Sequence, residues 1–243
     1  MQEVGTPKIA LVAGAAGGIG AALCHRLDQA GWRIALVGRT ASTLEALGAE
    51  LKDARIFIAD ITRSEEVQGA WDAVTDQMGM PTSVAHCVGS ILLKPAHLLS
   101  DQDWLNTIDL NLNSSFYLLR SATRAWSRAP YPGNLVFCSS AAAKIGLANH
   151  EAIAAAKAGL EGLIRSAAAS YSTRGIRVNG VAPGLVETGL AAKITGSEGA
   201  LISTEEEEHD VTERQVQRRS GTRIRDTPDY RLFGNERGLG GCG

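Results

Sequence analysis

Short apolar runs rich in β-branched residues recur six times between residues 8 and 182. Each run is too short for a helix and ends in turn residues, and segments with helical spacing separate one run from the next. Strands that alternate with helices in this way predict right-handed crossovers and a parallel sheet covered on both faces. The six predicted strands are Lys8–Ala13, Arg33–Gly38, Arg55–Ala59, Ser83–Val88, Asn134–Ser139 and Ile176–Ala182.

Three segments between the strands have helical spacing. Two of them, residues 101–126 and 150–171, are long and amphipathic. A shorter one follows the third strand, where Thr62-Arg63-Ser64-Glu65 has the form of a capping box and Gly79 marks the end. The 243 residues are 44% hydrophobic, which is enough for one large core. We therefore predict an α/β, doubly wound parallel sheet of the Rossmann type, formed by a single domain over residues 1–203.

Residues 204–243 depart from this pattern. Eight of these forty residues are hydrophobic, sixteen are charged and none is alanine. Such a composition buries too little apolar surface to offset the loss of chain entropy, so we expect a charged, disordered tail. A second interpretation is that the reading frame or gene model changes near residues 199–203 and the end of the domain is lost.

The charge and cysteine patterns argue against several classes of protein. The formal net charge is −2 and no arginine-rich face precedes the tail, so we expect no nucleic acid partner. No stretch approaches about eighteen uninterrupted apolar residues, and the N-terminus has no apolar leader, so we expect a cytoplasmic protein without a membrane segment. The cysteines have no CxxC or metal-ligand spacing, which predicts free thiols and no metal site. They are Cys24, Cys87, Cys138 and Cys242.

A glycine-rich loop, Ala13–Gly20, lies between the first predicted strand and an apolar helix. Glycines allow a tight turn there and a close approach of the backbone to a pyrophosphate, which helix N–H groups bind. A second strand that ends about twenty residues later favours a dinucleotide site over a purely structural turn. The residues expected beside the pyrophosphate are Gly14, Ala16, Gly18, Ile19 and Gly20.

The end of the second predicted strand bears on the choice of cofactor. NAD sites usually place a carboxylate there, whereas an arginine accommodates the 2′-phosphate of NADP. This sequence has Arg39 followed by Thr40, which favours NADP over NAD, although the glycine loop carries no basic residue of its own. The simpler interpretation is that Arg39 is a solvated loop charge.

Taken in order, these motifs resemble the classical short-chain dehydrogenase/reductase family over residues 8–190, and especially its 3-oxoacyl-carrier-protein reductase-like members. The glycine loop is similar to the family's TGxxxGIG, and residues 177–188 are close to the family's loop over the nicotinamide. The resemblance implies an NAD(P)(H)-dependent oxidoreductase that interconverts a carbonyl and a secondary alcohol of a small molecule. It also implies a homodimer or homotetramer built on the two long helices.

The resemblance assigns cofactor contacts to several residues. Asp60 and Ile61, at the end of the third strand, would bind the adenine, and Gly89 is what remains of the family's NNAG motif. The simpler interpretation of Asp60 is a turn aspartate. The loop over the nicotinamide would contribute Pro183, Gly184, Val186 and Thr188.

The resemblance also implies catalytic roles. Asn111 would kink the long helix and hold a water of the proton relay, Ser140 would bind the substrate, and Lys157 would bind the nicotinamide ribose. An exposed helix asparagine and a serine that caps a loop are the simpler interpretations of the first two.

Position 153 departs from the family pattern. The family carries Tyr-x-x-x-Lys on one helix face, so that the tyrosine exchanges the carbonyl proton, but here Ile153 precedes Lys157. Loss of a general acid typically slows a reaction about 10²–10⁴-fold. His150 could donate the proton from the same side, or be an ordinary polar residue at a helix start. The oxidoreductase is favoured over a non-catalytic NADP-binding protein and over the product of a damaged gene.

Overall fold

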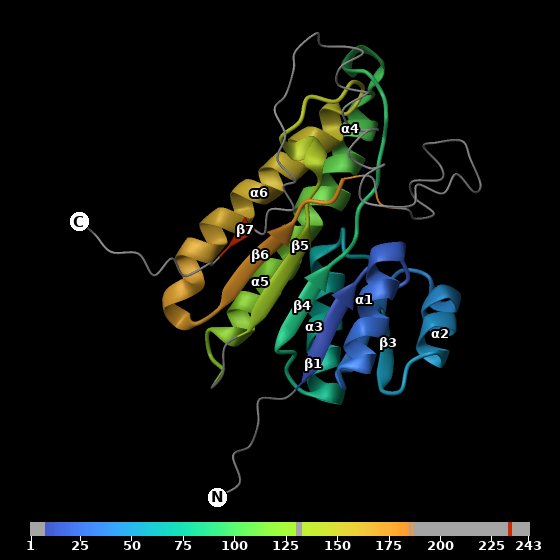
Figure 1. Cartoon of the computed structure of the whole chain (residues 1–243), viewed down its shortest axis with the longest axis vertical. Helices are drawn as coiled ribbons and strands as arrows, with labels where there is room; N and C mark the ends of the chain where they lie inside the picture. Colours follow the sequence, from blue (N-terminus) through green and yellow to red (C-terminus); the bar gives the residue numbers. More distant parts are fainter. Residues whose placement is uncertain (1–7, 130–132, 185, 187–232, 235–243) are drawn as a thin grey trace, which may run out of the picture.

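Seven strands form one sheet in the order β3-β2-β1-β4-β5-β6-β7 (Figure 1). The computed structural model describes residues 8–129, 133–184, 186 and 233–234. Strands β1 to β6 pair in parallel, and β7 pairs antiparallel with β6. The strands are β1 Ile9–Ala13, β2 Arg33–Gly38, β3 Ala54–Ile58, β4 Ser83–His86, β5 Asn134–Cys138, β6 Arg177–Val181 and β7 Phe233–Gly234.

The predicted doubly wound α/β fold is confirmed, and all six predicted strands lie within two residues of their expected bounds at each end. Within the segment 204–243, for which we predict a charged, disordered tail, Phe233–Gly234 pairs with Asn179 and Gly180 of β6. A two-residue strand needs only backbone hydrogen bonds, so composition could not indicate it. The rest of residues 204–243, and with it the predicted disorder, lies outside the described residues.

Helices cover both faces of the sheet, as parallel strands require (Figure 1). On one face α3, α5 and α6 pack on the sheet, and Trp71 of α3 meets Trp126 of α5 edge to face with ring centroids 5.9 Å apart. On the other face α1 and α2 enclose a second core around Val12 and Leu36. The helices are α1 Gly18–Gln29, α2 Ala41–Ala49, α3 Ser64–Met78, α4 Asp101–Ile108, α5 Ser114–Trp126 and α6 Glu151–Tyr171.

The two long predicted helices are present. Residues 101–126 are helical throughout, but a π-helical turn, Asp109–Asn113, joins α4 to α5. A π-turn is often found at functional sites, and this one carries Asn111. Among the described residues, no helix is long and apolar enough to cross a membrane.

The predicted capping box at Thr62 is wrong. Helix α3 begins at Ser64, and no side chain bonds its N-terminus. The Thr62 hydroxyl instead donates to Oδ1 of Asp60 at 2.7 Å, and the Thr62 backbone N–H donates to the same oxygen at 3.0 Å. The aspartate therefore shapes the turn after β3 and uses the hydroxyl that a cap would need.

The sheet order places a crevice between β1 and β4. From β1 the chain winds outward to β2 and β3, then crosses back to β4 and winds the other way. The loops after these two strands diverge at their carboxyl ends, which is where open α/β sheets bind ligands.

Candidate functional site

The glycine-rich turn follows β1 directly. Gly14 has a φ of +78°, and a Cβ there would lie 2.7 Å from Cγ2 of Val88. A Cβ on Gly20 would lie 2.2 Å from the carbonyl oxygen of Gly14. Both positions therefore exclude side chains. Gly17 is the N-cap of α1 and provides no side-chain cap, so the first N–H groups of the helix can bind an anion.

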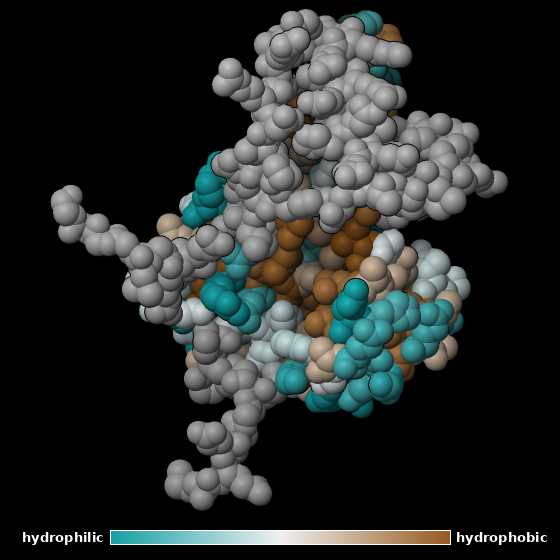
Figure 2. All heavy atoms as spheres, in the orientation of Figure 1, coloured by the Kyte–Doolittle hydropathy of each residue, from teal (hydrophilic) through white to brown (hydrophobic). Residues whose placement is uncertain are grey.

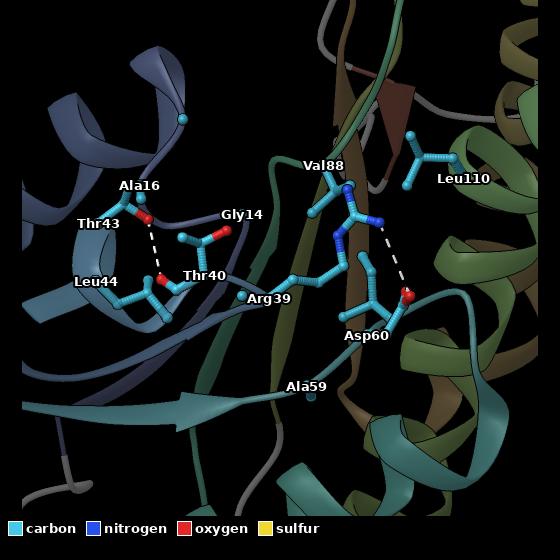
Figure 3. A pocket seen from close by; sticks show the side chains of 13 residues that line it. Gly14, Ala16, Arg39, Thr40, Thr43, Leu44, Ala59, Asp60, Val88 and Leu110 are labelled. Carbon is cyan, nitrogen blue, oxygen red and sulfur yellow. Dashed lines mark hydrogen bonds and ion pairs between the residues drawn. The ribbon is translucent and has the colours of Figure 1, made fainter.

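A cavity of about 180 Å³ lies on one side of this turn (Figure 3). Figure 3 shows the Arg39 guanidinium reaching toward Asp60, with 3.8 Å between Nη1 and Oδ2. Burial opposes ionisation of Asp60, but hydrogen bonds from Thr62 and the nearby Arg39 outweigh it and lower the pKa of the carboxyl. The cavity brings together six predicted cofactor contacts, Gly14, Ala16, Arg39, Thr40, Asp60 and Ile61.

A larger cavity of about 430 Å³ lies on the other side of the turn and shares Ala16, Gly17 and Val88 with the first. Figure 2 shows hydrophobic residues gathered over the middle of the molecule, above the polar surface around α2. The predicted site residues that line the larger cavity are Ala16, Gly18, Ile19, Gly89, Asn111, Ser140, Lys157, Pro183, Gly184 and Val186.

Lys157 lies on α6 and is only 5% exposed. Its Nζ donates to the backbone carbonyl oxygen of Cys138 at 2.7 Å. Burial disfavours the charged form and lowers the pKa of the ammonium to about 8. Ile153, one helical turn earlier, is 3% exposed and lines the same cavity. An apolar side chain thus occupies the position from which the family's phenol would act.

Ser140 follows β5 and begins a short 3₁₀ turn. Its Oγ accepts a hydrogen bond from the backbone N–H of Ala142 at 3.2 Å, as a loop-capping serine would. Accepting this bond leaves the hydroxyl hydrogen available for a ligand. Because Ser140 also lines the larger cavity, the capping role and a substrate-binding role are compatible.

Asn111 is fully buried, so it is not the exposed helix residue of the simpler interpretation. Its Oδ1 accepts from the Ser90 backbone N–H at 3.1 Å, and its Nδ2 donates to Ser90 Oγ and to the Thr107 carbonyl oxygen. A Cβ on Gly89 would lie 3.1 Å from Asn111 Oδ1. The asparagine therefore holds the loop after β4 against the π-turn, a contact that the sequence did not reveal.

Three predicted residues lie elsewhere. His150 immediately precedes α6, lines neither cavity, and has its Nδ1 2.8 Å from the carbonyl oxygen of Ala148. Gly20 is buried inside the turn, where it allows the close backbone approach and lines neither cavity. Thr188 lies outside the described residues.

Sequence reasoning missed a buried carboxylate beside the site. Glu161 is 3% exposed and accepts a hydrogen bond from the hydroxyl of Ser139 at 3.2 Å. It also pairs with Lys144 and Arg165 at 3.7 and 3.6 Å. Glu161 follows Lys157 by four residues on the same helix, and this spacing is the sequence feature that could have indicated that the two share a helix face.

Sequence reasoning also missed Cys87 and Cys138, which line the larger cavity with their Sγ atoms 4.0 Å apart. Each is the next-to-last residue of a predicted strand, but no local pattern indicates that the two side chains meet. In the part of the chain that the structure describes, no cluster of three or more potential metal ligands is present.

Comparisons with known proteins agree with this arrangement. The family described as short chain dehydrogenase matches residues 8–199. D-threitol dehydrogenase of Mycolicibacterium smegmatis is 37% identical over 190 residues, which are 76% of this chain and 73% of that protein. The 3-oxoacyl-acyl-carrier-protein reductase FabG of Pseudomonas aeruginosa is 30% identical over 191 residues, 77% of each chain.

Comparison with a solved structure also shows similarity to a short-chain dehydrogenase. A short-chain type dehydrogenase/reductase from Mycobacterium ulcerans superposes with a TM-score of 0.72 at 34% identity, over 78% of this chain and 72% of that one. The family match over residues 8–199 includes the glycine turn, the described residues of both cavities and the helix that carries Lys157. The chain therefore belongs to the short-chain dehydrogenase family, and it is an NAD(P)-dependent oxidoreductase of the class that acts on carbonyl and alcohol groups.

Proposed function

We propose that this chain uses NADP(H) to interconvert a ketone and a secondary alcohol on a small molecule, and that Lys157 exchanges the proton in place of the absent phenol. The observation that carries the proposal is the pair of cavities that meet at the glycine turn. One has Arg39 in its wall and the other has Lys157, so the two together suit a dinucleotide with a phosphate on one ribose.

The residues present fit such a cofactor. The turn leaves helix N–H groups without side-chain caps for a pyrophosphate, and Arg39 is 65% exposed at its side chain, so it can approach a 2′-phosphate. Asp60 and Ile61 line the same small cavity and can bind the adenine. When bound, the nicotinamide supplies or accepts the hydride.

The proton is the part of the reaction that this chain must handle differently. Among the described residues that line the larger cavity, Lys157 is the one with a formal charge. An ammonium has three donors, and only one of them is used by the Cys138 carbonyl. With a pKa of about 8, Lys157 can give up a proton and regain it near neutral pH. Ser140 orients the substrate oxygen with its free hydroxyl hydrogen.

The names of two relatives suggest which substrates to test. D-threitol is a polyol and a 3-oxoacyl thioester is a ketone, so both belong in the first panel with simple ketones, quinones and sugars. The assay follows NADPH absorbance with each carbonyl and NADP⁺ reduction with each alcohol. Thermal-shift titrations with NADP and NAD run in parallel, because preferential stabilisation reports binding. Binding of NADP without turnover of any substrate would favour a non-catalytic role.

We also propose that α4 and α5, which lie in the first of the two long predicted helices, contribute to the subunit interface of the homodimer or homotetramer that the family resemblance implies. Trp104, Leu105 and Phe116 are 42%, 52% and 43% exposed, although each is a large apolar side chain. Such residues on neighbouring helices suit a two-fold contact. Analytical ultracentrifugation of the wild type and of Phe116→Asp tests this: the substitution should shift the protein to monomers.

A further inference from the structure

Cys87 and Cys138 occupy equivalent places on neighbouring strands. In the parallel pairing of β4 and β5, Ala85 lies opposite Val136 and His86 opposite Phe137. Cys87 directly follows β4 and Cys138 is the last residue of β5, so the two side chains leave the sheet on the same face. Their Sγ atoms share a hydrogen bond at 4.0 Å.

Both thiols are accessible from the larger cavity. Each is partly buried, and each contributes to the cavity wall beside Lys157. Lys157 lies close enough to favour negative charge on both sulfurs. The pair therefore has what a reactive thiol needs, namely access from solvent and a neighbouring cation.

The two thiols differ in acidity. The contact between the two sulfurs and the nearby Lys157 outweigh burial and lower the pKa of Cys138, whereas the same contact and burial raise the pKa of Cys87. Cys24 provides a contrast within the same chain, because it is fully buried and burial raises its pKa to about 12. Lys157 Nζ also bonds the Cys138 carbonyl oxygen at 2.7 Å, which places the cation beside Cys138, so we assign Cys138 as the nucleophile and Cys87 as the resolving thiol.

We propose that Cys87 and Cys138 form a redox-active dithiol in the wall of the substrate cavity, which a hydroperoxide oxidises to a disulfide and a small-molecule or protein thiol reduces again. Nothing in the reduction of carbonyls requires these two thiols, so this is a second, separate chemistry at the same cleft. It does not depend on which coenzyme binds.

The reaction balances in two steps. The Cys138 thiolate attacks the outer peroxide oxygen, the O–O bond breaks, and an alcohol or water leaves, which makes Cys138 a sulfenic acid. The Cys87 sulfur then attacks the Cys138 sulfur, the S–O bond breaks, and water leaves with the Cys87 proton. Two thiols are oxidised by two electrons in total, and one peroxide is reduced.

The strand geometry permits the bond. Neighbouring strands lie about 4.8 Å apart, which is within the range of about 4.4–6.8 Å that separates the Cα atoms of disulfide-bonded cysteines. The sulfurs must approach from 4.0 Å to about 2 Å, a change that side-chain rotation can make.

Mass spectrometry of the full chain tests the proposal. Cys242 lies outside the described residues, so the experiment uses a Cys242→Ser background as well as the wild type to exclude other linkages. After brief treatment with hydrogen peroxide and alkylation of the remaining thiols, the expected product has lost two alkylation sites. A linked peptide pair should contain Cys87 and Cys138, and dithiothreitol should restore both sites.

Single variants assign the order of events. Cys87→Ser should stop at a Cys138 sulfenic acid that dimedone traps, and Cys138→Ser should leave Cys87 reduced. Cys24→Ser is the matched control and should keep the linkage. The proposal is overturned if peroxide leaves both thiols of the folded wild-type protein open to alkylation, or if the linked peptides join other cysteines. Circular dichroism of each sample verifies that the protein is folded.

Discussion

Lys157 donates a hydrogen bond from Nζ to the carbonyl oxygen of Cys138, and the two atoms are 2.7 Å apart. This contact joins α6 to the end of β5 and fixes a buried ammonium in the cavity wall. Ile153 lies one helical turn away on the same cavity and offers no exchangeable proton. In the proposed reaction, proton exchange therefore falls to Lys157.

Restoring a phenol at position 153 should raise the rate of carbonyl reduction. In Ile153→Tyr the hydroxyl would lie one helical turn from Lys157, so that the ammonium favours its ionised form. We expect an increase in kcat of about 10²-fold or more. Ile153→Phe is the matched control because it adds the same ring without the hydroxyl. A similar gain in both variants would show that cavity shape, and not proton transfer, limits the reaction.

The wild-type enzyme should show opposite pH profiles in the two directions. Reduction needs the Lys157 ammonium, which is the main form below pH 8, so its rate should fall as the pH rises through about 8. Alcohol oxidation needs the neutral amine, so its rate should rise over the same range. Steady-state kinetics from pH 6 to pH 10 measure both. A reduction rate that stays flat across pH 8 contradicts the role of Lys157 as proton donor.

Removing the buried charge should stabilise the fold while it abolishes turnover. The folded state lowers the pKa of Lys157 from 10.5 to about 8, so below pH 8 the folded protein carries a charge that is better solvated in the unfolded chain. Lys157→Met should therefore raise the free energy of unfolding at pH 7 by about 2 kcal/mol, after allowance for one lost hydrogen bond.

The stability gained in Lys157→Met should depend on pH, and this dependence is the control. Above pH 10.5 the lysine is neutral in both states, so the penalty disappears and the gain from Lys157→Met should shrink. Urea unfolding at pH 7 and pH 10 measures the difference. An equal gain at both values would attribute the stabilisation to packing.

Most of this fold could be predicted from the sequence because the spacing of apolar residues indicates which residues are buried. The strands around Leu11 and Leu36 are apolar runs bounded by turns and are buried on both faces, whereas the strand around Leu135 alternates buried and half-buried residues. The failures had two causes. The Thr62 hydroxyl bonds to Asp60, two residues earlier, because a local side-chain contact competes with the helix cap. Asn111 bonds to the Ser90 loop, twenty-one residues away, and local sequence patterns carry no information on such a partner.

The same distinction applies to the site. The glycine turn, Arg39 and Lys157 were visible because each belongs to a spaced motif. Cys87 and Cys138 were not, because they are fifty-one residues apart and meet only through the pairing of β4 with β5. The strand order of a doubly wound sheet therefore had to be known before the thiols could be seen as a pair.

Arg39 should determine the preference for NADP over NAD. A charged hydrogen bond to a phosphate is worth about 1.5–3 kcal/mol, so Arg39→Ala should weaken NADP binding roughly 10-fold to 150-fold and leave NAD binding nearly unchanged. Arg63→Ala is the matched control, since Arg63 pairs with Glu66 and lines neither cavity. Isothermal titration calorimetry with both coenzymes measures the effect. An equal loss of affinity for NADP and NAD would mean that Arg39 attracts both coenzymes through its charge and does not recognise the 2′-phosphate.

A methyl group at two glycines should have opposite effects on stability. A Cβ on Gly20 would lie 2.2 Å from the Gly14 carbonyl oxygen, so Gly20→Ala must displace the turn and should destabilise the fold by about 3 kcal/mol. Gly69 lies in the exposed interior of α3 with no heavy atom within 4 Å of the added carbon, so Gly69→Ala should stabilise the fold by about 0.5–1 kcal/mol. Urea unfolding compares the stabilities of the two variants, and coenzyme titration adds a second readout.

Gly20→Ala should also lose coenzyme affinity because the turn carries the anion site, whereas Gly69→Ala should keep it. Unaltered binding in a folded Gly20→Ala protein would mean that the phosphates lie elsewhere.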